Sequence, residues 1–66
     1  MNRLDELNAL ITRLQAEFDV HQAAYLAAVR AGDSVAASAA LERQRPINDQ
    51  LQPALVERLN LSRQPT

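Results

Sequence analysis

His21 is the one histidine in this sequence, and imidazole is a common acid–base catalyst and metal ligand, so it is the first candidate for such chemistry. A zinc site or a catalytic centre needs further ligands or a nucleophile beside the imidazole, and the chain has no cysteine and no second histidine. Its 8 carboxylates are scattered, and its single glycine, Gly32, forms no phosphate-binding loop. We therefore expect no enzyme activity, no metal and no cofactor.

The basic side chains are the next candidates, because clustered arginines bind nucleic acid or acidic protein surfaces. Arg43 and Arg45, with Arg30 close by, form one local basic group in a chain whose formal net charge is -1. A nucleic-acid surface normally has more basic residues and exposed aromatics, whereas this chain has one Phe and one Tyr. We expect Arg43 and Arg45 to orient a protein partner instead, and nucleic acid is the least favoured partner.

The size of the chain limits how it can be stabilised. A chain of 66 residues buries only about 60% of its unfolded surface, so small domains usually add disulfides, a metal or a partner chain. The absence of cysteine leaves oligomerisation or a partner. No apolar stretch is long enough for a membrane span, and the first residues do not resemble a signal peptide, so we expect a cytoplasmic protein.

A row of mostly apolar residues recurs at alternating steps of three and four along the first half of the chain. This spacing predicts a helix that packs lengthwise against another helix. Asn2 is a suitable N-cap, and Asp5 and Glu6 lie in the first turn, where the helix dipole favours negative charge. This main row consists of Leu4, Leu7, Ile11, Leu14, Phe18, His21, Tyr25 and Ala28.

The stretch "RAGDS" at residues 30–34 predicts a tight turn, since Gly32 can adopt a left-handed conformation and Asp33 or Ser34 can cap a second helix. A short connection predicts an antiparallel helical hairpin. The expected single domain spans residues 1–62. Its elements are a helix over about 2–31, a turn at 31–34, a second helix over about 34–62 and a flexible tail at 63–66.

The second helix contains two prolines, Pro46 and Pro53, on the face opposite its apolar residues. An interior proline removes a backbone hydrogen bond and bends a helix away from its own side. One interpretation is a continuous helix kinked near Pro46, and the other is a break at residues 45–48 followed by a new helix. In both, a row of apolar residues at four-residue steps covers the first helix: Ile47, Leu51, Leu55 and Leu59.

The hairpin predicts a register in which facing residues have numbers that add to about 65. Phe18 then meets Ile47, and Leu14 meets Leu51. By the same rule His21 faces Gln44, which predicts one polar layer that fixes the register at some cost in stability.

A second row lies roughly opposite the main row on the first helix and consists mainly of alanine. One interpretation is a solvated face of good helix formers. The other is a contact surface, because small residues let a further helix approach closely, either in a homodimeric four-helix bundle or against a partner protein. The expected partner or dimer interface is Ala9, Arg13, Ala16, Val20, Ala24, Ala27, Tyr25, Arg43 and Arg45.

The length, the hairpin layout and the "AGD" turn are similar to those of several families of small helical hairpins. They resemble plasmid copy-number regulators that dimerise and bind paired RNA loops, hairpin co-chaperones of type III secretion needle subunits, and small phage-encoded inhibitors of host proteins. We expect a non-enzymatic protein–protein interaction module, an adaptor or inhibitor, with a secretion-type chaperone subunit as the alternative and a nucleic-acid-binding dimer third. No small-molecule substrate is expected.

Overall fold

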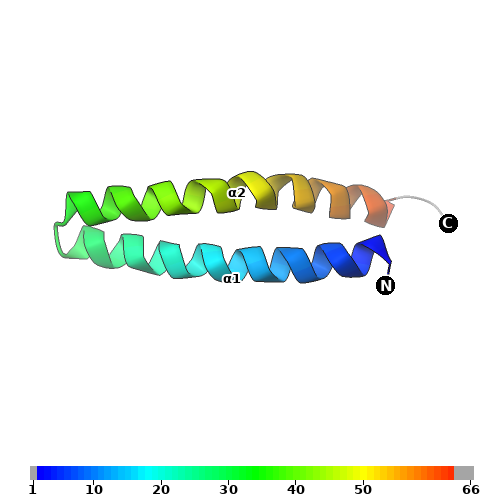
Figure 1. The fold of residues 1–66 in the computed structure, drawn as a ribbon, viewed down its shortest axis with the longest axis horizontal. Coiled ribbons are helices and arrows are strands. Elements are labelled where there is room, and N and C mark those ends of the chain that lie inside the picture. Colours follow the sequence, from blue (N-terminus) through cyan, green and yellow to red (C-terminus); the bar gives the residue numbers. More distant parts are fainter. Residues whose placement is uncertain (1, 64–66) are drawn as a thin grey trace.

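The protein is a two-helix hairpin. A computed structural model of the chain describes residues 2–63, with helix α1 over Arg3–Arg30 and helix α2 over Ser34–Arg63. The helices lie side by side along their length, and the start of α1 and the end of α2 are at the same end of a rod of 52 × 16 × 15 Å (Figure 1). Arg63 belongs to α2, and the rest of the expected flexible tail, residues 64–66, lies outside the described residues.

Local hydrogen bonds fix the start of α1 and the turn. The Asn2 side chain accepts a hydrogen bond from the Asp5 amide at 2.8 Å and so caps α1. Gly32 has a φ of 69°, a left-handed conformation that other residues adopt only at a cost. The Asp33 amide donates to the Ala28 carbonyl at 2.9 Å, and the Asp33 side chain accepts from the Ala36 amide at 3.0 Å. Asp33 therefore closes α1 and caps α2.

Helix α2 runs without interruption through both prolines, so the alternative of a break at residues 45–48 is wrong. Pro46 and Pro53 are both exposed, as the helical spacing predicted. A proline ring on the outer side of a helix meets water and not the neighbouring helix, which explains why α2 can accommodate both residues.

The core lies between the main row of α1 and one face of α2, in the half of the hairpin nearest the chain ends. Leu7, Ile11 and Leu14 are at most 2% exposed and pack against Ile47 and Leu51. This agrees with the predicted pairing of Leu14 with Leu51. Near the turn, in contrast, the buried apolar residues of the two helices are the small Ala28 and Ala40.

The predicted apolar row of α2 is wrong at its last residue, Leu59. Leu55 is partly buried and packs against the core, but Leu59 is 49% exposed, and Ala54 is buried in the core. Each four-residue step advances about 40° around a helix, so a row at four-residue steps turns away from the neighbouring helix. The contact face follows alternating steps of three and four, as in the main row of α1.

The predicted polar layer between the helices is present and includes Gln44, but Gln44 bonds to Gln22 and not to His21. The buried Gln44 side chain donates to the side-chain oxygen of Gln22 at 2.7 Å. His21, the residue predicted to face Gln44, directly precedes Gln22 in the sequence and is half-buried. A second cross-helix bond joins Arg58 to Asn8 at 3.4 Å, and in both pairs the residue numbers add to 66. The predicted register is therefore correct to within one residue.

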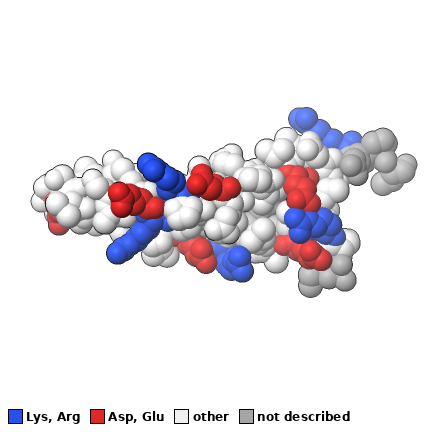
Figure 2. All heavy atoms as spheres, turned by 45° about the horizontal axis from the view of Figure 1, so that its top comes forward, with Lys and Arg blue, Asp and Glu red and all other residues white. Residues whose placement is uncertain are grey.

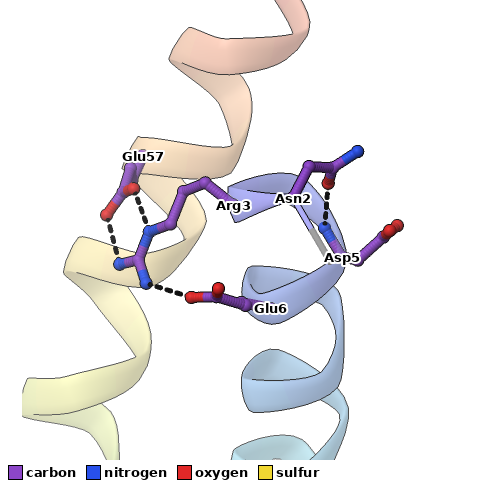
Figure 3. Close-up of polar contacts among 5 residues, drawn as sticks. All are labelled: Asn2, Arg3, Asp5, Glu6 and Glu57. Atoms are coloured by element: carbon purple, nitrogen blue, oxygen red, sulfur yellow. Dashed lines mark hydrogen bonds and ion pairs between the residues drawn. The ribbon is translucent and has the colours of Figure 1, made fainter.

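An ion pair closes the open end of the hairpin. Nε and Nη2 of Arg3 donate to the two carboxylate oxygens of Glu57 at 2.6 and 2.8 Å, and Nη1 reaches Glu6 at 3.4 Å (Figure 3). The hydrogen bond from Arg3 lowers the pKa of Glu57, and the same bond raises the pKa of Arg3. Because both side chains are about half exposed, we expect the pair to fix the register more than to add stability.

Candidate interaction surface

The predicted interface residues other than Tyr25 all lie on the exposed surface of the hairpin. The second row follows the side of α1 that faces away from α2, so it is available for contact with another helix. The exposed residues of the predicted interface are Ala9, Arg13, Ala16, Val20, Ala24 and Ala27 of the second row, together with Arg43 and Arg45 of α2. This row is continuous along α1, but it contains only one large apolar side chain, Val20, which is 65% exposed.

A second and more apolar surface lies along the junction of the two helices near the turn. Two adjoining hollows of about 390 Å³ each share Leu41 as a lining residue. The hollow nearer the turn is lined by Tyr25 and Val29, among others, and the other by Phe18, Arg45 and Asn48. We call these two hollows together the groove.

The groove exists because α1 and α2 are joined near the turn by alanines. Ala28 and Ala40 fill the contact between the helices there, and neither reaches far enough to cover its neighbours. Tyr25 is consequently half-buried, and Val29 and Leu41 remain 52% and 48% exposed. Tyr25, one of the predicted interface residues, lines the hollow nearer the turn at the edge of the core.

The predicted interface did not include Leu26 and Val29, two apolar residues on the side of α1 that borders the groove. On α1, Leu26 and Val29 follow Asp19 and Gln22 at alternating steps of three and four, so these residues share one face of the helix. The sequence signal for this face is weak, because only Leu26 and Val29 of these four positions are apolar. The abundance of alanine on the opposite side of α1 directed the prediction to the second row instead.

Arg43 and Arg45 do not form one surface. Arg45 lines the groove beside Phe18 and Asn48, whereas Arg43 is two residues away, a separation that turns a helix by about 200°. Neither arginine forms an ion pair within residues 2–63, where the ion pairs are those of Arg3 with Glu6 and Glu57.

Charges of both signs are interspersed on the molecule. In the face shown in Figure 2, acidic and basic side chains alternate along the rod, and few charged groups lie toward the turn, at the left. Interspersed charge does not produce the single-sign field that draws a protein to nucleic acid.

His21, the candidate for acid–base or metal chemistry, is half-buried on α1. Within residues 2–63, no group of three or more His, Cys, Asp or Glu side chains is placed to hold a metal ion. No helix of this part of the chain is both long and apolar enough to span a bilayer. No protein-family model, curated protein or solved structure matches the chain.

Proposed function

We propose that this chain is a non-enzymatic interaction protein, an antiparallel helical hairpin that pairs with a second copy in a four-helix bundle and binds and regulates another protein. The observation that supports this function is the amount of large apolar surface outside the core. These side chains, from 37% to 79% exposed, are Leu4, Val20, Leu26, Val29, Val35, Leu41, Val56 and Leu59.

The size of the core supports the same proposal. Its fully buried large side chains are Leu7, Ile11 and Leu14, Ile47 and Leu51 of α2 are also buried, and the other large residues packed against this cluster are only partly buried. A chain of this length without disulfides gains little margin from such a core, because ordering each residue costs about 1–2 kcal/mol of backbone entropy. Burial of exposed apolar groups in an assembly supplies the missing stabilisation.

The two exposed surfaces suit different contacts. The second row of small residues allows close approach of a partner helix, with Arg13 placed within the row to fix its orientation. The groove offers larger apolar side chains, which contribute more to association because they bury more area. A hairpin with two such surfaces can assemble with itself and still bind another protein.

The proposal is tested by the dependence of stability on protein concentration. The midpoint of thermal unfolding, followed by circular dichroism from about 1 μM to about 100 μM, is expected to rise with concentration, because assembly stabilises only the folded chain. A helical protein whose midpoint is constant over this range would contradict self-assembly. A chain with little helix at any concentration would favour the alternative of a chaperone subunit that folds on its partner.

A further inference from the structure

We infer that a second copy of this chain covers the groove, in a side-by-side dimer in which Asp19 of each copy meets Arg45 of the other. This inference rests on the proposed function and deepens it, because it assigns self-assembly to the groove and leaves the second row for a different protein. Neither Asp19 nor Arg45 has an ion-pair partner within residues 2–63.

The exposed area of the hairpin matches the requirement of such a dimer. A typical folded monomer of 7.3 kDa exposes about 4,200 Å². This rod exposes 4924 Å², an excess of about 700 Å² over a typical monomer. A stable protein–protein interface removes about 800 Å² from each partner. Packing of a second hairpin lengthwise would thus reduce the exposed surface of each chain to about that of a typical monomer of the same mass.

The groove side has charges of opposite sign on its two helices. On α1, Val29 lines the groove, and Asp19 and Leu26 share its helix face by their spacing. On α2, Leu41 and Arg45 line the groove. In the register set by the Gln22–Gln44 and Asn8–Arg58 bonds, Asp19 lies at the level of residue 47, close to Arg45 along the rod. Each hairpin therefore presents an acid on one helix and a base at nearly the same level on the other.

A two-fold axis along the rod makes this pattern self-complementary. The rotation places α1 of each copy on α2 of the other and leaves every residue at the same position along the rod. Asp19 therefore meets Arg45 at two symmetric contacts, and Leu26 meets Leu41 at two others. The two turn ends, where the groove is most apolar, then form one shared core. A head-to-tail dimer would instead place Arg45 near the uncharged Gln52 and give Asp19 no base at its own level.

The dimer is tested with Asp19→Arg and Arg45→Glu, two exposed positions at which charge can be reversed. In the inferred dimer, each variant alone turns both ion pairs into repulsive contacts, and we expect its dimer dissociation constant to rise about tenfold or more. An equimolar mixture of the two variants restores opposite charges at both contacts, one pair reversed and one native. The mixture is therefore expected to dimerise about as tightly as the wild type.

Arg43→Glu is the matched control, since it makes the same charge change on the same helix away from the groove, and we expect it to leave dimerisation unchanged. Leu41→Glu should abolish the dimer, while Val35→Glu, at a position 79% exposed, should not. Circular dichroism of every variant identifies any that fails to fold. The mixture is compared with each folded variant alone by sedimentation at the same total concentration.

Failure of the mixture to recover dimerisation would overturn the inference, because recovery depends only on the two-fold pairing. A dimer that survives Arg45→Glu and Leu41→Glu but is lost in the Ala16→Glu, Ala27→Glu double variant would also overturn it. That result would leave the proposed function intact and assign self-assembly to the second row. A wild type that is folded and monomeric at every concentration contradicts both the inference and self-assembly.

Discussion

Replacing Leu14 with Ala tests the packing of the hairpin most severely. The Leu14 side chain is 2% exposed and belongs to the cluster formed with Ile11, Ile47 and Leu51. Removal of three buried carbons costs about 2.4 kcal/mol of transfer free energy at about 0.8 kcal/mol each. The cavity left between two stiff helices raises the expected loss to about 3–4 kcal/mol, within the range of about 2–5 kcal/mol for such changes.

The loss is large compared with the total stability of the chain. At about 0.05–0.15 kcal/mol per residue, 66 residues give about 3–10 kcal/mol. We therefore expect Leu14→Ala to be largely unfolded in mild urea, as measured by circular dichroism at the same protein concentration as the wild type. Unfolding of the wild type over a urea series at that concentration provides the reference.

Leu59→Ala is the matched control, because it removes the same atoms from a side chain that is 49% exposed. We expect it to cost less than about 1 kcal/mol of unfolding free energy. The comparison also separates the structure from the sequence pattern, which had placed Leu59 on the buried face. Equal losses at the two positions would refute the observed contact face of α2.

Two further changes test the prolines and the ion pair of the open end. Pro46→Ala should raise the free energy of unfolding by up to about 3 kcal/mol, measured in urea, because it restores a helical hydrogen bond at an exposed position; a loss of stability would show that packing requires the proline. Because the pKa of Glu57 is lowered in the folded state, its contribution is present above its ordinary value of 4.5 and is lost as the pH falls through the folded value. Glu57→Gln should therefore lose less stability than the wild type between about pH 5 and pH 3, and identical acid profiles would refute the role of the pair.

The sequence predicted the hairpin well because its signals are local. Asn2 and Gly32 fix the ends of α1 through short-range hydrogen bonds and backbone conformation. The alternating steps of the main row specify which side of α1 is buried. These features depend on few residues each, and no distant part of the chain competes with them.

The parts that the sequence did not predict depend on comparison between the two helices. Gln22 and not His21 bonds to Gln44, because a shift of one residue along α1 decides which side chain reaches across. The groove was missed because it arises where alanines at the helix contact leave Val29 and Leu41 uncovered. Whether such residues are exposed depends on the size of the side chains on the facing helix, and the spacing of residues within one helix does not show this.

The solution mass of the chain, measured by light scattering over a dilution series, tests the central claim most directly. If the exposed helical surface serves self-assembly, a helical species of twice 7.3 kDa should persist into the low micromolar range. A fully helical species of 7.3 kDa at the highest concentrations would contradict the claim, because the hairpin would then be stable with its apolar surface in water.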